Sequence, residues 1–375
     1  MKKKIVLVTW KGGGNFGTCL QCYALYNKIH SLGYQISLLQ SKPQLYTFKL
    51  QIKGLLAEIG LLGVLKRIKK IALHKSKSLQ EKKRFSFQED VYNTVTLYSY
   101  RQENKLVANT DCFVTGSDQI WNTYYCFNPF FFLSFAGNTK RIAYASSIGT
   151  NSIKKEYEDK VKQLLLRFCH IAVREDEAVK VLSGLTGRHD IIQVLDPTFL
   201  LSPKEWNEMS CKAKYELRLP SDYLFCYLIG DNPWYKEQLS VVKKLLGIDN
   251  IIVIPAEENK DFTFSEAIIY QHASPIEFVD LLQKAKYVCT DSFHATALCI
   301  NHSVPFVEFM RFKDNDKKSQ NSRIYDILAH FGLMARIYYA DSLEWTKPIN
   351  YAKVQEILTV DRQKSMDYLI NAIEN

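Results

Sequence analysis

The sequence predicts an α/β protein of two domains, and three observations support this. The chain has 375 residues, which exceeds the size at which a single hydrophobic core usually stops growing. It opens with a strand–helix–strand pattern, and a second series of alternating strands and helices starts after residue 205. The composition, 47% hydrophobic and 23% charged, is that of a chain able to bury a sizeable core in each domain.

The first domain begins with an apolar strand at residues 4–10 and a glycine loop. Residues 18–30 then carry apolar side chains at helical spacing, and Gly33 ends that helix. Because residues 34–39 predict a second strand, the unit is βαβ, and its right-handed crossover implies a parallel sheet. Further buried strands are predicted at residues 112–115, 141–146, 170–173 and 191–195. Ligands of open parallel sheets bind beyond the carboxyl ends of the strands, where these segments end in small or polar residues.

The boundary between the domains is predicted near residue 205. Leu195-Asp-Pro-Thr198 predicts a turn, and Ser202 followed by Pro203 predicts a capped helix. The second series has predicted strands at residues 223–229, 251–255, 287–290 and 304–309, and residues 351–373 predict a final helix. We therefore predict an N-terminal domain at residues 1–205, a C-terminal domain at residues 206–345 and a C-terminal helical segment at residues 346–375.

Charge and cysteine content indicate which kind of partner and which cellular compartment to expect. The net charge of +10 and the pI of about 8.9 imply an anionic partner. Residues 64–85 carry nine Lys/Arg against one Glu, which predicts either a solvated helix face or a basic amphipathic helix in peripheral contact with an anionic membrane. Nine cysteines in a long chain indicate reduced thiols. With no apolar run long enough to span a bilayer, we expect a cytoplasmic protein, either free or on the inner face of the membrane.

The glycine loop after the first strand matches GxGxxG at Gly12, Gly14 and Gly17. A dinucleotide site also needs an acidic residue at the end of the second strand, but that strand ends in Gln40-Ser41, which disfavours NAD. A P-loop needs a lysine before Ser/Thr, whereas Thr18 directly follows Gly17, which disfavours ATP. Two interpretations are left, an anion at the helix N-terminus and a tight turn without a ligand.

Three segments after predicted strands carry candidate functional groups. Gly116-Ser-Asp-Gln-Ile-Trp-Asn122 concentrates hydrogen-bonding side chains, which suits a hydroxyl-rich ligand, although Asp118 could instead cap a helix. Arg174 could clamp a carboxylate or phosphate, or form a surface pair with Glu175. His294 lies at a strand-to-helix turn, where an acid/base group or a phosphate donor would be effective. Asp314-Asn-Asp316 is flanked by lysines and predicts a solvated loop, so no metal site is assigned.

These segments together resemble the polysaccharide pyruvyl transferase family. The matching motifs occur in order along most of the chain: Asn15-Phe-Gly17 with Leu20–Leu25, residues 116–122, Arg141–Ser146, Val173-Arg-Glu175, Leu195–Thr198, Thr290-Asp-Ser-Phe-His294 and Asn321-Ser-Arg-Ile324. The resemblance implies a GT-B-like fold, in which two Rossmann-like domains face each other across a cleft and a C-terminal helix returns to the first domain. It also implies transfer of pyruvate from phosphoenolpyruvate to a sugar, as a ketal, in cell-surface polysaccharide biosynthesis such as that of a capsule or exopolysaccharide.

The resemblance assigns roles to residues of this chain. The catalytic candidates are His294, Arg174 and Asp118. The C-terminal domain is expected to be the donor side, and the donor contacts are expected from Arg174, Ser292, His294 and Arg323. The N-terminal domain is expected to hold the acceptor, through Asn15, Gly17, Ser117, Asp118, Gln119, Trp121 and Asn122. Phosphoenolpyruvate is the expected donor substrate; no cofactor and no nucleic-acid partner are expected, and the acceptor is a sugar whose attachment to a lipid carrier is left open.

The sequence departs from the family pattern at two positions, and two other functions are also compatible with it. Ser292 stands where some members have an arginine, so the donor could be held differently or be another molecule, and Ala295 stands where many have glycine. One rival is a glycosyltransferase that uses a nucleotide sugar, because the same architecture hosts that reaction. The other is a non-catalytic component of a polysaccharide machine at the membrane surface, which would use the basic segment.

Overall fold

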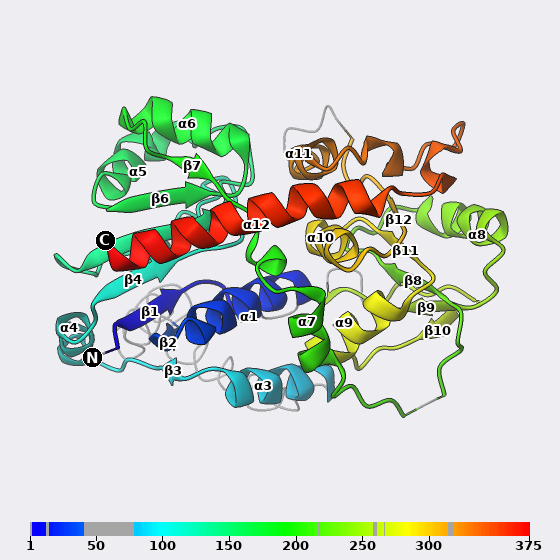
Figure 1. The fold of residues 1–375 in the computed structure, drawn as a ribbon, viewed down its shortest axis with the longest axis horizontal. Coiled ribbons are helices and arrows are strands. Elements are labelled where there is room, and N and C mark those ends of the chain that lie inside the picture. The colour runs from blue at the N-terminus through cyan, green and yellow to red at the C-terminus, as the bar shows by residue number, and fades with distance from the viewer. Residues whose placement is uncertain are drawn as a thin grey trace, which may run out of the picture.

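The computed structural model describes residues 2–12, 15–40, 79–216, 218–257, 261–265, 267–313 and 319–375. It forms two parallel sheets, each covered by helices, that lie side by side along the long axis of the molecule (Figure 1). Three features singled out in the sequence fall outside the described residues: Gly14 of the glycine loop, residues 64–78 of the basic segment, and Asp314–Asp316. Among the helices that are described, none combines the length and the apolar character needed to cross a membrane.

The first sheet has seven strands in the order β3-β2-β1-β4-β5-β6-β7. Its strands are β1 (Lys4–Val8), β2 (Gln35–Leu39), β3 (Thr94–Val95), β4 (Cys112–Thr115), β5 (Lys140–Ser146), β6 (His170–Val173) and β7 (Ile192–Gln193). All neighbouring pairs are parallel. The central strands are buried on both faces, which explains why they were recognisable as continuous apolar runs.

The second sheet has five parallel strands in the order β10-β9-β8-β11-β12. They are β8 (Leu224–Tyr227), β9 (Ile251–Val253), β10 (Ala267–Ile269), β11 (Tyr287–Thr290) and β12 (Phe306–Glu308). Strands β3 and β10 were not predicted from the sequence, because both are short edge strands without a fully buried apolar run. The predicted parallel α/β pattern is present in both halves of the chain.

The described helices connect and cover the strands. With the first sheet belong α1 (Phe16–Ser31), α3 (Leu79–Val91), α4 (Tyr100–Ala108), α5 (Glu158–Leu165) and α6 (Asp176–Thr186), and with the second α7 (Pro203–Ser210), α8 (Tyr235–Leu246), α9 (Pro275–Lys284), α10 (Phe293–His302) and α11 (Ser322–His330). The predicted cap at Ser202 is present, because its side chain accepts from the Glu205 backbone N–H while Glu205 accepts from that of Ser202. We call each sheet with its helices a unit, the first unit being that of the seven-stranded sheet. The boundary predicted at residue 205 falls inside α7, which packs on α9 of the second unit.

The last helix, α12 (Tyr351–Glu374), lies across both units (Figure 1). Near its start, Gln355 Nε2 donates to the Ile300 carbonyl (2.9 Å) at the end of α10. Near its end, Tyr368 Oη donates to the Ala143 carbonyl (2.8 Å) in β5. This helix therefore ties the second sheet to the first.

A shared apolar core also joins the two units. Phe16, at the start of α1, stacks on Phe278 of α9 with ring centroids 4.7 Å apart, and meets Tyr227 of β8 edge-to-face at 5.8 Å. All three side chains are fully buried or nearly so. The N-terminal end of α1 is consequently fixed against the second unit, close to the carboxyl end of β11.

Candidate active site

A cavity of about 610 Å³ lies between the two units and gathers six of the predicted site residues. Asn15, Asp118 and Gln119 reach it from the first unit, and Ser292, His294 and Arg323 from the second. Five of the six follow β1, β4 or β11, whose carboxyl ends point to this region, and Arg323 enters from α11. This is the position at which open parallel sheets bind ligands.

His294 occupies the first turn of α10, directly after the buried strand β11. Ser292 starts this helix, since its hydroxyl accepts from the Ala295 backbone N–H (3.5 Å). Gly17 of α1 packs against the imidazole so closely that a Cβ at that position would lie 2.2 Å from His294 Nδ1. Glycine is therefore required at position 17 if the imidazole is to keep this orientation.

Asp196 lies beneath His294 and organises a buried polar network. Its Oδ2 is 3.6 Å from His294 Nε2 and accepts from Arg174 Nη1 (3.0 Å) and Ser117 Oγ (3.1 Å). Its Oδ1 accepts from both the backbone N–H and the hydroxyl of Thr198. Burial disfavours the charged form, but the facing His294 and Arg174 outweigh this and hold the pKa of Asp196 well below its ordinary value. A carboxylate thus faces the imidazole at ion-pair distance, and His294 Nε2 has no hydrogen-bond partner among the described residues.

Arg174 is buried in the same network and does not line the cavity that contains His294. Its Nε donates to Glu175 Oε1 (3.0 Å), and its guanidinium carbon lies 4.3 Å from the centroid of the Phe293 ring. Burial lowers the pKa of this guanidinium, but Glu175 and Asp196 outweigh burial and raise it. Arg174 thus holds Asp196, while its own buried Nη2 has no hydrogen-bond partner among the described residues. The direct clamp of Arg174 on the donor stays a prediction. The predicted partner Glu175 is present, although the pair is buried and not on the surface.

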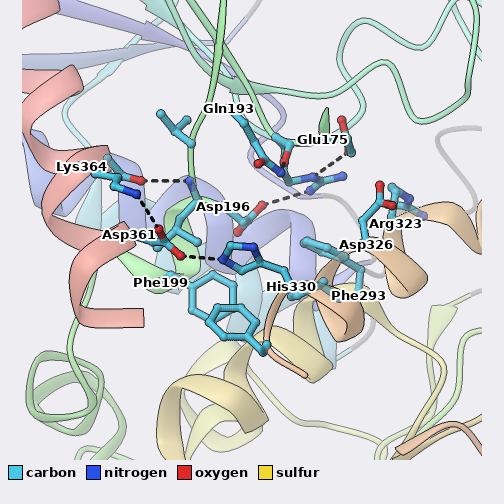
Figure 2. A pocket seen from close by; sticks show the side chains of 16 residues that line it. Glu175, Gln193, Asp196, Phe199, Phe293, Arg323, Asp326, His330, Asp361 and Lys364 are labelled. Carbon is cyan, nitrogen blue, oxygen red and sulfur yellow. Dashed lines mark hydrogen bonds and ion pairs between the residues drawn. The ribbon is translucent and has the colours of Figure 1, made fainter. Parts of the chain in front are cut away.

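On the far side of Phe293 lies a second, smaller cavity of about 90 Å³ (Figure 2). It is bordered by α11 and α12, and Figure 2 shows His330 and Lys364 both directed at Asp361. Phe293 and Arg323 line both cavities, so they form the partition between them.

Arg323 lies in this partition, and its guanidinium borders the large cavity. Its Nη2 donates to Gln320 Oε1 (2.6 Å), which also accepts from Gln119 Nε2 (3.0 Å) of the first unit. Its Nε is buried and has no hydrogen-bond partner among the described residues. Burial, and then the positive charge of Arg174, lower the pKa of the Arg323 guanidinium to about 9. An anion bound here would supply the partner and the countercharge that Arg323 lacks.

Asp118 faces the same cavity from the carboxyl end of β4. Its Oδ2 accepts from Thr18 Oγ1 (2.7 Å) in α1 and its Oδ1 from the Gln119 backbone N–H (2.9 Å). Its φ of 62° is left-handed, a conformation that Asp tolerates better than most residues. The carboxylate is thereby held at the cavity wall. A helix cap, the alternative role, would require it to lie at a helix N-terminus.

Besides Gly17, which is buried against His294, three of the predicted acceptor contacts are internal in the structure. Trp121 is 1% exposed, stacks on Phe132 and donates to the Phe131 carbonyl, so it belongs to the core of the first unit. Asn122 accepts from the backbone N–H groups of residues 124 and 125 and so holds a turn. Ser117 is fully buried and donates to Asp196. The residue type suits a ligand contact in each case, but burial makes these side chains part of the support beneath the cavity.

Three residues around the site, Asp196, Thr18 and Gln21, were not predicted from the sequence. Gln21 is fully buried; it accepts from the Ser117 backbone N–H (3.0 Å) and donates to the Trp10 carbonyl (2.8 Å). Asp196 and Gln21 both lie in motifs that carry the family resemblance, residues 195–198 and 20–25. A polar residue within an otherwise apolar or turn-forming motif was the signal that could have identified them.

Acidic and thiol side chains do not suggest a metal centre in the described part of the chain. There, no three His, Cys, Asp or Glu residues gather in a way that could hold a metal ion. Asp291, next to the site, instead accepts from the backbone N–H groups of Ile229 and Gly230 and from Arg311 Nε. It is therefore committed to joining β11 to the loop after β8.

Comparison with known families shows to which family this chain belongs. The family model described as polysaccharide pyruvyl transferase matches residues 15–310. The chain belongs to the polysaccharide pyruvyl transferase family. The match spans α1, β4, β6 and the start of α10, and so includes most of the residues around the large cavity. No curated protein matches the sequence significantly.

Solved structures show that this family member has a GT-B-like fold. A UDP-GlcNAc 2-epimerase from Methanocaldococcus jannaschii is 11% identical, with coverage of 96% of this chain and 92% of the other and a TM-score of 0.50. A glycosyltransferase from Rickettsia africae is also 11% identical, with coverage of 100% and 99% and a TM-score of 0.50. At such identities the likeness concerns the arrangement of the two sheets and their helices, and not the reaction.

Proposed function

We propose that this chain transfers pyruvate from phosphoenolpyruvate to a sugar and forms a ketal with two of its hydroxyls. The observation that carries the proposal is the pairing, in one cavity, of His294 backed by the buried Asp196 carboxylate with the incompletely partnered guanidinium of Arg323. The first pair suits proton transfer, and Arg323 suits an anionic donor.

The donor side of the proposal rests on His294 and Arg323. Phosphoenolpyruvate carries a carboxylate and a phosphate, and a buried guanidinium with a free N–H binds either group well. Ser292, which stands where some family members have an arginine, is used to cap α10. Arg323, which enters the cavity from α11, supplies a guanidinium there instead.

The chemistry assigns one proton transfer to each side of the cavity. The donor's methylene carbon gains one proton and becomes a methyl group, and we assign this proton to His294. Two C–O bonds form between the donor's C2 and the sugar hydroxyls, while the bond from C2 to the phosphate oxygen breaks. One of the two hydroxyl protons returns to His294 and replaces the proton that it gave. The other hydroxyl proton leaves with the phosphate. Asp118, fixed by Thr18, is the carboxylate we place beside those hydroxyls.

The test is phosphate release from phosphoenolpyruvate in the presence of a panel of nitrophenyl and lipid-linked sugars. Wild type should release phosphate only with an accepted sugar, and His294→Ala should lower kcat by about 10²-fold or more, as expected for loss of a general acid. His272→Ala is the matched control, because this histidine is exposed in a loop. Equal turnover of His294→Ala and wild type would remove the assignment. Binding of a nucleoside diphosphate by calorimetry, without binding of phosphoenolpyruvate, would favour glycosyl transfer instead.

A further inference from the structure

The large cavity has an aromatic wall on the side of the first unit. Trp10, directly after β1, Tyr125, and Phe131 of η1 (Pro129–Phe132) all line it. We call these three side chains the aromatic wall. None of them was singled out by the sequence motifs.

The rings of the aromatic wall support one another. Trp10 meets Phe131 edge-to-face, with ring centroids 5.8 Å apart at 88°, and Tyr125 at 6.2 Å and 74°. The Trp10 backbone is held by the amide of Gln21, and the Phe131 carbonyl accepts from the buried Trp121 and Thr115 side chains. Trp10 and Phe131 are therefore held on a buried base, which lowers the entropy that this part of the wall loses when a ligand binds.

The exposed aromatic ring of Tyr125 has no evident role in stabilising the fold. The residue is 78% exposed, although it lines the cavity and its ring packs edge-on against Trp10. Its neighbour Tyr124 is also exposed, at 56%, but its hydroxyl hydrogen-bonds Ser152 and its ring does not line the cavity. An exposed aromatic ring at the mouth of a cavity gains most when a ligand covers it.

We propose that the aromatic wall stacks against a pyranose ring of the acceptor, an inference that rests on the proposed pyruvyl transfer. A pyranose has C–H groups that form an apolar face and hydroxyls around its edge. An aromatic wall next to the carboxylate of Asp118 and the amides of Asn15 and Gln119 offers a complement to both. The small donor, with its carboxylate and its phosphate, has no comparable apolar face, so it belongs on the side of His294 and Arg323.

The placement also fits the direction of transfer. Asp118 lies on the same side of the cavity as the wall, whereas His294 and Arg323 enter from the second unit. A sugar stacked on the wall would present its edge hydroxyls to Asp118 and to the donor. The wall then selects acceptors with a flat, C–H-rich ring face.

The test compares Tyr125→Ala with its neighbour Tyr124→Ala. Tyr125→Ala should raise KM for the acceptor roughly 3- to 10-fold, the range typical of one aromatic contact, while binding of phosphoenolpyruvate by calorimetry stays unchanged. Tyr124→Ala should behave as wild type, and Tyr125→Phe should restore the acceptor KM because it keeps the ring. An acceptor KM within about twofold of wild type in Tyr125→Ala, or an equal rise in Tyr124→Ala, would overturn the proposal.

A second measurement separates this inference from the proposed function. Saturation-transfer NMR with methyl pyranosides, which lack an aromatic aglycone, reports ring contact without any turnover. If wild type binds them and Tyr125→Ala binds them several-fold more weakly, the wall stands even if no phosphate is released, and only the reaction is wrong. If phosphate is released but the transfer signals do not depend on Tyr125, the reaction stands and the wall is wrong.

Discussion

Gly17 is the residue at which α1 comes closest to the imidazole of His294. In a helix, Gly→Ala usually stabilises by about 1 kcal/mol. Here the added Cβ would lie 2.2 Å from His294 Nδ1, so we expect Gly17→Ala to lower the unfolding free energy by about 1–3 kcal/mol through overpacking. It should also displace the imidazole and lower kcat at least tenfold in the phosphate-release assay. Urea denaturation measures the first effect.

Gly184 provides the control for this prediction, because it lies in α6 and a Cβ added there would meet no other atom within 4 Å. Gly184→Ala should stabilise by about 0.5–1 kcal/mol and leave kcat unchanged. If the two variants behaved alike, the close packing of Gly17 on His294 would be disproved.

Among the elements, α12 has the clearest bridging contact at Arg362. Its Nε donates to the Phe199 carbonyl (2.6 Å) in η3 (Pro197–Phe199), and its Nη2 donates to Asn301 Oδ1 (2.9 Å) in α10. Arg362→Met keeps the apolar stem but leaves two partly buried acceptors unpaired. We expect a loss of about 1–3 kcal/mol in the unfolding free energy, measured by urea denaturation.

Lys364, two residues along the same helix, is the matched comparison. Its side chain is 73% exposed and its ion pair with Asp361 spans 3.6 Å. Lys364→Met should change the unfolding free energy by less than about 0.5 kcal/mol, since exposed pairs contribute little. A loss in Lys364→Met as large as that in Arg362→Met would show that α12 is not held by the Arg362 contacts.

For the whole molecule, the shared core around Phe16 predicts that the two sheets unfold together. Phe16 packs on Phe278 and Tyr227 of the second unit, and α12 joins both units. Wild type should therefore show one calorimetric transition. Phe16→Ala should cost about 3–5 kcal/mol and split the transition in two, because it removes contacts between the units.

Phe113 of β4 is equally buried, but it packs within the first unit, edge-to-face with Phe135. Phe113→Ala should destabilise by a similar amount but keep a single, shifted transition, because the contacts between the units remain. A single, merely shifted transition in Phe16→Ala would show that α12 alone is sufficient to couple the units.

Three features of the molecule could be predicted from the residues alone: the parallel α/β pattern, the capped helix after Ser202, and the cluster of Asp118, Ser292 and His294 at strand ends. These features are local, because central parallel strands are apolar on both faces, caps are set by neighbouring residues, and ligands bind where such strands end. The short edge strands β3 and β10 lacked that signal.

Which residues of each motif face the cavity depends on tertiary packing. Asp196 became part of the site only because folding brings it within 3.6 Å of His294, which lies 98 positions further along the chain (294 − 196). Trp121 left the predicted site because its ring fits against Phe132 and Phe168, and the aromatic wall arose from three segments without a common motif. Burial and contact between distant segments depend on how whole elements pack, and no local pattern encodes that packing.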